Sequence, residues 1–235
     1  VDTSGFGLHK RGYRVKTVAA PIKETLAAAM VQLSFWNKDR VLLDPCCGSG
    51  TIAIEAAMIG RNIAPGLSRS FACEEWEAID KKLWKEEKRA YDLMDNTSKL
   101  DIVAIDIDKM AIDAAKENAV EAGVDDCIRF INADMSRIKA SQPSGIIITN
   151  PPYGERIGER KQIAAIYSKY KKFFAENPSW SMFIVTTDKD IEGKVFGRKA
   201  DRRRKLYNGR LEVCYYQFHG KKIGDNGKAK QAEQK

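Results

Sequence analysis

The stretch "NPPYGERIG" at residues 150–158 places an amide, two prolines and an aromatic ring directly after the apolar run "GIIIT". The side-chain oxygen of Asn150 and the carbonyl oxygen of Pro151 can both accept hydrogen bonds from a planar amino group, such as that of a nucleobase or a carboxamide. Pro151 and Pro152 fix the backbone and remove competing N–H donors. Tyr153 can stack on the planar group, although a Pro-rich turn in which Tyr153 only packs as a lid is the alternative. The stretch therefore predicts a site that holds an amino group for reaction with an electrophile.

A second stretch, "LLDPCCGSGTIAIEAA", puts a carboxylate at the end of a predicted strand, followed by a glycine turn and a helix. Gly48 and Gly50 allow a ligand to approach the backbone closely, and the helix start at Thr51 offers free N–H groups. The spacing fits neither G-x-x-x-x-G-K-[ST] nor G-x-G-x-x-G, so ATP and NAD are disfavoured. Asp44 would suit a ligand that carries an ammonium group. A plain glycine turn of an α/β fold is the alternative.

Two further strands end in acidic residues. Asp106 is placed to accept hydrogen bonds from both hydroxyls of a ribose, whereas Asp108 is favoured as the N-cap of the next helix. Asp134 could accept a hydrogen bond from an adenine amino group, with Met135 and Ile107 on the two sides of the ring; on its own it would be an ordinary loop aspartate. Together these residues predict a nucleoside at the carboxyl ends of the strands.

Such a site needs a sheet that brings distant loops together. Helices expected from Thr51, Lys109 and about Arg160 alternate with short β-branched runs at residues 40–44, 101–106, 128–132, 145–149 and 181–187. This alternation predicts a mostly parallel sheet with helices on both faces. The run "RRRKLYNGRLEVCYYQF" contains an Asn-Gly pair between two strand-like segments, which is typical of a hairpin. The predicted fold is therefore α/β, with a seven-stranded, mostly parallel sheet that ends in an antiparallel hairpin.

The chain divides into a leader, one α/β domain and a tail. We expect an extended basic leader at residues 1–20, the α/β domain at residues 21–219, and a disordered basic tail at residues 220–235. The domain contains a helical insertion at about 61–100, for which the spacing of Trp76, Ile79, Leu83 and Trp84 predicts a helix with core contacts. Because the first residue is Val1, we expect a piece of a longer protein.

Composition narrows the partners. A net charge of +8 favours a polyanion such as a nucleic acid, although solubility and the basic tail would explain it equally well. No apolar run is long enough to cross a bilayer, and no signal peptide is visible. The five cysteines form no CxxC pair and there are only two histidines, which disfavours a metal site. An odd cysteine count fits a reducing compartment, so we expect a cytoplasmic location without membrane or metal.

The order of "DPCCGSG", Asp106, Asp134 and "NPPY" resembles that in class I S-adenosylmethionine-dependent methyltransferases that modify amino groups. More narrowly, "LHKRGYR", "APIKETLAAAM", "IAPG", "FACEEW" and "NPPYGERIG" resemble the THUMP-associated (UPF0020-type) RNA guanine-N2 methyltransferases, particularly the bacterial 23S ribosomal RNA branch. The resemblance spans about residues 1–219. It implies a Rossmann-like class I methyltransferase fold, S-adenosylmethionine as cofactor and RNA as substrate. Full-length relatives carry an N-terminal RNA-binding THUMP domain, so we expect this chain to be the catalytic domain alone.

The resemblance also implies roles for individual residues. The acceptor loop, formed by Asn150, Pro151, Pro152 and Tyr153, would be catalytic. The residues implied in holding the cofactor are Asp44, Gly48, Ser49, Gly50, Thr51, Asp106, Ile107, Asp134, Met135 and Asn150. Candidates for contacts with RNA phosphates are Lys10, Arg11, Arg14, Arg156, Arg160, Arg202, Arg203 and Arg204. For each of these taken singly a solvated surface charge is the default, except Arg156, which follows the acceptor loop directly.

The predicted function is transfer of a methyl group to guanine N2 in 23S ribosomal RNA. One alternative is a tRNA guanine-N2 methyltransferase. Another is an adenine-N6 or protein-glutamine methyltransferase, which would share "NPPY" but is expected to lack "LHKRGYR" and "FACEEW". The third is a module that binds the cofactor and RNA without catalysing transfer.

Overall fold

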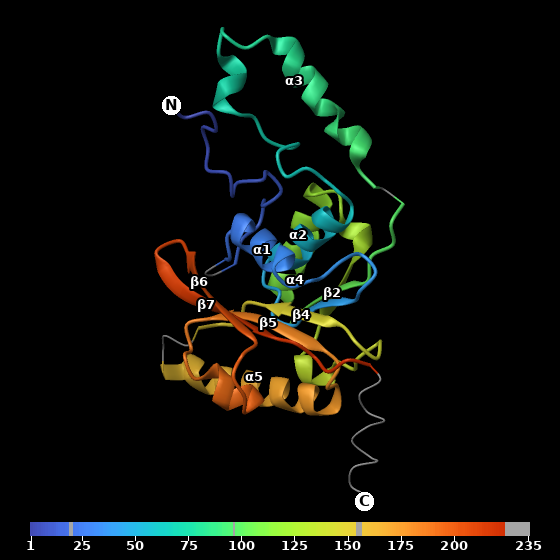
Figure 1. The fold of residues 1–235 in the computed structure, drawn as a ribbon, viewed down its shortest axis with the longest axis vertical. Helices are drawn as coiled ribbons and strands as arrows, with labels where there is room; N and C mark the ends of the chain where they lie inside the picture. The colour runs from blue at the N-terminus through green and yellow to red at the C-terminus, as the bar shows by residue number, and fades with distance from the viewer. Residues whose placement is uncertain (19–20, 96, 154–156, 224–235) are drawn as a thin grey trace, which may run out of the picture.

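The protein forms one seven-stranded sheet with helices on both faces (Figure 1). The computed structural model describes residues 1–18, 21–95, 97–153 and 157–223. Within them the strand order is β3-β2-β1-β4-β5-β7-β6. The strands are β1 (Leu42–Asp44), β2 (Ile102–Asp106), β3 (Ile128–Asn132), β4 (Ile146–Thr149), β5 (Ser181–Thr186), β6 (Arg202–Asn208) and β7 (Leu211–Phe218). The predicted sheet is confirmed.

The pairing is parallel except at the last hairpin. β1 pairs in parallel with β2 and β4, β2 with β3, and β4 with β5. β7 runs antiparallel to both β5 and β6. Asn208 pairs with Leu211 across the turn, and Gly209 has φ +67°, a conformation that favours glycine. The Asn-Gly hairpin predicted from the sequence is therefore confirmed.

Alternate side chains of each central strand point to opposite faces of the sheet, and both faces are buried. Leu42, Ile102 and Ile146 belong to the core on one face, under α1 (Glu24–Gln32), α2 (Thr51–Gly60) and α4 (Lys109–Glu121). Their neighbours along the strands belong to the core on the other face, under α5 (Ile157–Glu176). Two short 3-10 helices, η3 (Asp125–Cys127) and η4 (Met135–Arg137), and the π-helix η5 (Glu192–Phe196) complete these layers. No helix among the described residues is both long and apolar enough to cross a membrane.

The strand order reverses between β1 and β4. The chain moves from β1 outward to β2 and β3, then crosses back to place β4 on the other side of β1. At such a switch point the loops at the carboxyl ends of two neighbouring strands diverge and leave a crevice. The loop after β1 and the loop after β4 therefore lie at the same edge of the sheet, although about a hundred residues separate them in the sequence.

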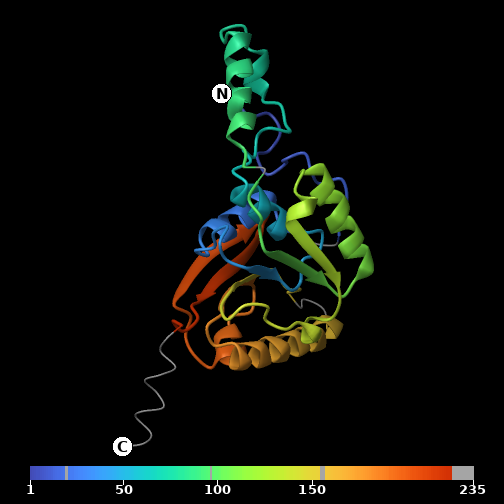
Figure 2. The same cartoon turned by 90° about the vertical axis from the view of Figure 1, so that its right-hand side faces the viewer.

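The insertion differs from the prediction. Its helical parts are η1 (Ala72–Glu75), α3 (Lys81–Glu87) and η2 (Lys88–Leu93), and they extend away from the sheet (Figure 2). Trp76 and Ile79 precede α3, and Leu83 is 54% exposed. Trp84 stacks on Phe71 within the insertion. The predicted core contacts are wrong, because α3 stands too far from the sheet for its apolar residues to reach either core.

Candidate active site

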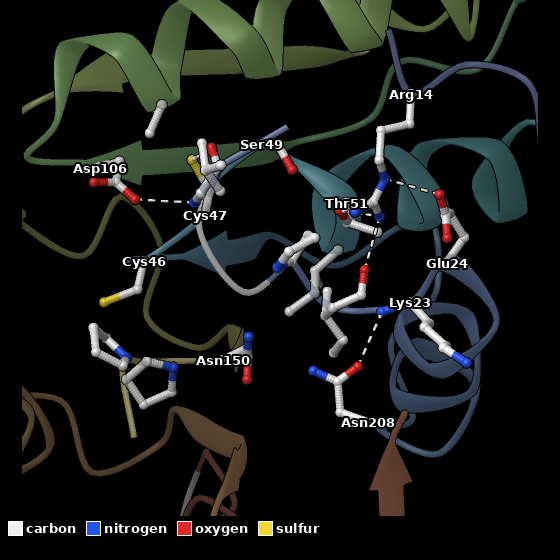
Figure 3. A pocket seen from close by; sticks show the side chains of 18 of the residues that line it. Arg14, Lys23, Glu24, Cys46, Cys47, Ser49, Thr51, Asp106, Asn150 and Asn208 are labelled. Carbon is white, nitrogen blue, oxygen red and sulfur yellow. Dashed lines mark hydrogen bonds and ion pairs between the residues drawn. The ribbon is translucent and has the colours of Figure 1, made fainter. Parts of the chain in front are cut away.

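A cleft of about 1370 Å³ opens at the carboxyl ends of the parallel strands. Three sequence-predicted elements line it: the glycine loop (residues 46–51), the end of β2, and the acceptor loop (residues 150–153). Ser49, Asp106 and Asn150 surround the same hollow in Figure 3. The volume exceeds the range of roughly 300–1,000 Å³ for a single small-molecule pocket. The cleft therefore has room for a nucleoside together with part of a second molecule.

Asp106 and the glycine loop hold each other in place. The backbone N–H of Gly48 donates to Oδ2 of Asp106 at 2.9 Å, and that of Asp108 donates to Oδ1 at 3.0 Å. Each carboxylate oxygen keeps a further lone pair, and Asp106 lines the cleft. The carboxylate can thus accept hydrogen bonds from a ribose. Asp108 is confirmed as the N-cap of α4, because its side chain accepts from the N–H of Met110 at 2.9 Å.

The start of α2 requires glycine at position 50. Gly50 has φ +83°, and a Cβ atom there would lie 2.9 Å from the Cβ of Ala115 on α4. Only a residue without a side chain fits this left-handed position so close to a neighbouring helix. The chain then enters α2 at Thr51, whose side chain lines the cleft beside the free N–H groups of the first helical turn. This arrangement suits an anionic carboxylate or other acceptor group.

Asp44 is fully buried beneath the glycine loop rather than on the surface of the cleft. Its Oδ1 accepts a weak hydrogen bond from the N–H of Cys46 at 3.4 Å, and its Oδ2 has no partner among the described residues. Burial raises the pKa of Asp44 to about 8, and the nearby charge of Asp106 adds to the rise. The free Oδ2 fits a cationic group bound above the loop, because such a charge would favour the ionised form of Asp44. Asp44 would attract this group electrostatically from beneath the glycine loop, without forming part of the surface of the cleft.

The acceptor loop is organised by one short hydrogen bond. The hydroxyl of Tyr153 donates to Oδ1 of Asn150 at 2.6 Å, and both residues line the cleft together with Pro151 and Pro152. Burial raises the pKa of Tyr153 to about 12, so the hydroxyl stays a proton donor at neutral pH. The ring of Tyr153 packs against the core beneath α1 and α2. Because an amide oxygen has two lone pairs, Oδ1 can still accept a hydrogen bond from a substrate amino group.

Three predicted adenine contacts lie outside this cleft. Oδ1 of Asp134 accepts from the N–H of Ser136 at 2.8 Å, and Oδ2 forms an ion pair with Lys169. The hydrogen bond from Lys169 lowers the pKa of Asp134 to about 2. Met135 is buried in the core under α5, whereas Ile107 is 71% exposed. The predicted sandwich of an adenine between Met135 and Ile107 stays a prediction.

Two of the candidates for contacts with RNA phosphates, Arg11 and Arg14, line the cleft and form ion pairs within the protein. Arg14 pairs with buried Glu24, and Arg11 with buried Glu55. These ion pairs compete with a phosphate for both side chains, and the contacts of Arg11 and Arg14 with RNA stay a prediction. Lys10 also lines the cleft, and unlike these two arginines its side chain is exposed.

The remaining basic candidates are scattered. Arg203 is paired with Glu192. Arg202 and Arg204 lie on β6 and point to the opposite face of the sheet from Arg203, because they alternate with it along the strand. None of these three lines the cleft. Arg156 falls outside the described residues, and Arg160 lies in the first turn of α5 with its side chain likewise outside the description.

The sequence did not reveal two walls of the cleft. The β6–β7 turn contributes Asn208, Gly209 and Leu211, and the start of α1 contributes Lys23. The N–H of Lys23 donates to Oδ1 of Asn208 at 3.4 Å. The Asn-Gly pair identified the hairpin, but only the antiparallel return of β7 beside β5 carries its tip to the acceptor loop.

Comparison with known proteins agrees with this geometry. Residues 11–217 match the family described as UPF0020: RMKL-like, methyltransferase domain. The Bacillus subtilis protein named "Putative RNA methyltransferase YpsC" is 48% identical over 227 residues, which cover 94% of this chain and 57% of that protein. The ribosomal RNA large subunit methyltransferase K/L of Shewanella baltica (strain OS155) is 40% identical over 231 residues, which cover 93% of this chain and 32% of that protein.

Solved structures show the same architecture. A possible methylase from Clostridium difficile 630 superposes with a TM-score of 0.89 at 48% identity, over 94% of this chain and 58% of that one. SMU.472, crystallised in complex with SAH, gives a TM-score of 0.88 at 46% identity, over 94% and 58% of the two chains. The chain thus spans less than two thirds of each of these relatives, and its fold is that of the class I methyltransferases. It belongs to the RMKL-like methyltransferase domain family.

Proposed function

We propose that the chain transfers a methyl group from S-adenosylmethionine to the N2 amino group of a guanine in RNA, specifically in the large-subunit ribosomal RNA. The observation that carries this proposal is the single cleft in which the glycine loop and Asp106 lie beside Asn150 and Tyr153. The family and the SAH-bound neighbour support S-adenosylmethionine as the cofactor. The name of the Shewanella relative supports ribosomal RNA as the substrate.

The residues present fit the cofactor. Asp106 would accept hydrogen bonds from its ribose, and the N–H groups at the start of α2 would meet its carboxylate. Asp44 would balance its ammonium group from beneath the loop once Asp44 has lost its proton. When bound, S-adenosylmethionine supplies a methyl group on a positively charged sulfur. Asp134, Met135 and Ile107 remain our candidates for the adenine side.

The acceptor loop prepares the amino group for attack. The lone pair of an exocyclic amino nitrogen is delocalised into the base, so the nitrogen must be held in place and polarised. Oδ1 of Asn150 and the carbonyl oxygen of Pro151 would each accept a hydrogen bond from the amino group. These two bonds would stabilise the positive charge that develops on its nitrogen. Fixed geometry supplies most of the acceleration, and the extra proton can leave to water. No dedicated base is needed before attack.

The charge distribution supports a nucleic-acid substrate. The chain carries a net charge of +8, and Lys10 and Lys23 are exposed at the cleft. Among the described residues all five cysteines are free thiols, which supports a reducing cytoplasm as the location. The relatives are longer than this chain, and we propose that the whole protein carries the RNA-binding THUMP domain that the sequence resemblance implies.

The test is to incubate the chain with labelled S-adenosylmethionine and either undermodified ribosomal RNA or tRNA, and to map the labelled nucleoside by mass spectrometry. We expect N2-methylguanosine in the large-subunit RNA. Label in tRNA or at adenine N6 would replace the substrate assignment. A chain that binds the cofactor but transfers nothing to RNA or protein would be a binding module, contrary to the proposal.

Asn150 provides the sharpest variant. Asn150→Ala should lower the transfer rate by about 10²–10³-fold, the usual effect of removing one preorganised polar group that stabilises transition-state charge. The matched control is Asn177→Ala just after α5, whose side chain donates to the carbonyl of Phe173 and to no other group among the described residues. If Asn150→Ala retains both full transfer and full cofactor binding, the catalytic assignment is wrong.

A further inference from the structure

The leader forms one wall of the cleft and is held by buried polar contacts. We call residues 11–18 the strap. The guanidinium of Arg14 makes three contacts with two other segments. Its Nη2 donates to the carbonyl of Ile22 at 2.7 Å and to Oγ1 of Thr51 at 2.9 Å, and its Nε lies 2.8 Å from Oε1 of Glu24 (Figure 3). One side chain thus links the strap to the start of α1 and to the start of α2.

A second clamp comes from α4. Asn118 is 1% exposed, and its Oδ1 accepts from the N–H groups of Val15 and Lys16 at 3.0 and 2.9 Å. Its Nδ2 donates to the carbonyl of Lys16 at 2.9 Å and to that of Ser49 at 3.1 Å. All four hydrogen bonds available to the amide are made. Asn118 therefore joins the strap to the glycine loop from behind, and it does not line the cleft.

Three further contacts complete the attachment. The hydroxyl of Tyr13 donates to Oε1 of Glu55 on α2 at 3.0 Å, and Arg11 pairs with the same carboxylate. A Cβ atom on Gly48 would meet Cγ2 of Val18 at 3.4 Å, so the end of the strap lies directly against the glycine loop. The strap is thus packed on the loop that we assign to the cofactor.

From these contacts we infer that Arg14 and Asn118 are positioning residues: they join the glycine loop to the strap and thereby fix the loop in its binding conformation. The inference rests on the proposed function, because the loop is assigned to the cofactor there. Its physical basis is that the loop leaves β1 with two glycines at positive φ, a backbone that gains much freedom when it is not held. Hydrogen bonds to the carbonyl of Ser49 and the hydroxyl of Thr51 remove that freedom before the cofactor binds.

The experiment measures the dissociation constant of S-adenosylhomocysteine by calorimetry, together with hydrogen–deuterium exchange of residues 46–52 in the ligand-free chain. Arg14→Ala and Asn118→Ala should each weaken the binding of S-adenosylhomocysteine about tenfold, which is the effect expected from the loss of one hydrogen bond that holds the loop. Both should speed exchange in the glycine loop. The catalytic rate at saturating cofactor should change less than the affinity.

Arg14→Lys separates charge from geometry. A lysine keeps the positive charge opposite Glu24. It cannot link the strap to the starts of both α1 and α2 as the planar guanidinium does. We expect the affinity of Arg14→Lys for S-adenosylhomocysteine to be close to that of Arg14→Ala. Should Arg14→Ala not fold, Arg14→Lys and Asn118→Ala give the same two measurements.

Val124→Ala is the matched control for stability. Val124 is buried in the same core beyond the end of α4 and makes no contact with the strap among the hydrogen bonds and ion pairs described. Truncating it should lower the melting temperature without changing affinity or loop exchange. If Arg14→Ala, Arg14→Lys and Asn118→Ala all bind S-adenosylhomocysteine as tightly as the wild type and leave the exchange of residues 46–52 unchanged, the positioning role is refuted. A wild-type chain that fails to bind S-adenosylhomocysteine refutes the proposed function instead, and loop exchange then still decides the positioning role.

Discussion

The hydroxyl of Tyr153 and the side-chain oxygen of Asn150 lie 2.6 Å apart in the acceptor loop. At the residue scale this bond suggests a role for Tyr153 in addition to the predicted stacking. It orients the amide of Asn150 so that the oxygen, rather than the nitrogen, is held in a defined position. A substrate amino group would then find an acceptor that needs no reorganisation, which is the condition under which a polar group lowers a barrier most.

Tyr153→Phe tests this role because it removes the hydroxyl and keeps the ring. The lost bond contributes about 0.5–1.5 kcal/mol, so the transfer rate should fall between about twofold and tenfold with little change in cofactor affinity. Single-turnover kinetics would measure the difference. The comparison variant is Tyr207→Phe, an exposed tyrosine on β6. A rate equal to that of the wild type would show that Asn150 is oriented by other groups.

Asp44 supplies a prediction about pH. Burial raises its pKa from an ordinary value near 4 to about 8, so between these two pH values the folded chain keeps a proton that the unfolded chain has lost. The free energy of unfolding therefore falls as pH rises through this window, by at most about 1.4 kcal/mol for each pH unit.

Asp44→Asn should remove that contribution. Urea titrations at pH 5 and pH 8 should show a smaller loss of stability in Asp44→Asn than in the wild type, by about 1 kcal/mol or more. Asp39→Asn, at an exposed aspartate, serves as the comparison. An equal pH dependence in wild type and Asp44→Asn would mean that Asp44 is not protonated in the folded state.

At the element scale, the contact between α2 and α4 decides the shape of the glycine loop. Gly50→Ala would force a side chain into a left-handed residue and against Ala115. The left-handed conformation alone costs about 1–2 kcal/mol, and displacement of α4 adds to it. We expect a lower melting temperature and a clear loss of cofactor affinity.

Gly123→Ala is a natural control for that variant. Gly123 also has a left-handed backbone, at φ +67°, but a Cβ atom there would meet nothing within 4 Å. It should lose only the conformational part of the stability, about 1 kcal/mol, and keep full affinity for S-adenosylhomocysteine. If both variants lose affinity equally, the approach of α4 is not what shapes the loop.

At the scale of the whole molecule, the distribution of charge matters more than its sum. The net charge of +8 is the same whether or not the charges are paired, but ion pairs within the protein engage Arg11, Arg14 and Arg203 with carboxylates. Lys10 and Lys23 are exposed where the leader and α1 border the cleft. These two residues are our candidates for phosphate contacts.

A double variant, Lys10→Ala with Lys23→Ala, should weaken RNA binding and reduce the slope of log affinity against log salt by about two. Its matched control is Lys221→Ala with Lys222→Ala. These two exposed lysines follow β7, and the N–H of Lys221 donates to the carbonyl of Pro178 ahead of β5, at the opposite edge of the sheet. Filter-binding titrations at several salt concentrations would measure the slopes. Equal slopes for both double variants would remove the cleft rim from the RNA interface.

The sequence alone determined the features that depend on local chemistry and on periodicity. The β-branched runs predicted five parallel strands, the Asn-Gly pair predicted the hairpin, and Asp108 was favoured as an N-cap, all of which the structure confirms. These predictions succeed because neighbouring residues set backbone conformation and because buried strands need apolar side chains on both faces. The glycine loop and Asn150 could be identified for the same reason, since each follows a strand directly.

Only the tertiary structure decided which charges meet. Arg14 and Glu24 are close in sequence, yet nothing in their spacing showed that one guanidinium would also reach Thr51, or that Asn118 would grip both the strap and the glycine loop. The tip of the hairpin likewise reached the cleft through the order of the strands. The wrong core contacts of the insertion have the same origin. A helical spacing of apolar residues predicts that one face of the helix will be buried. The tertiary structure decides which part of the protein packs against that face.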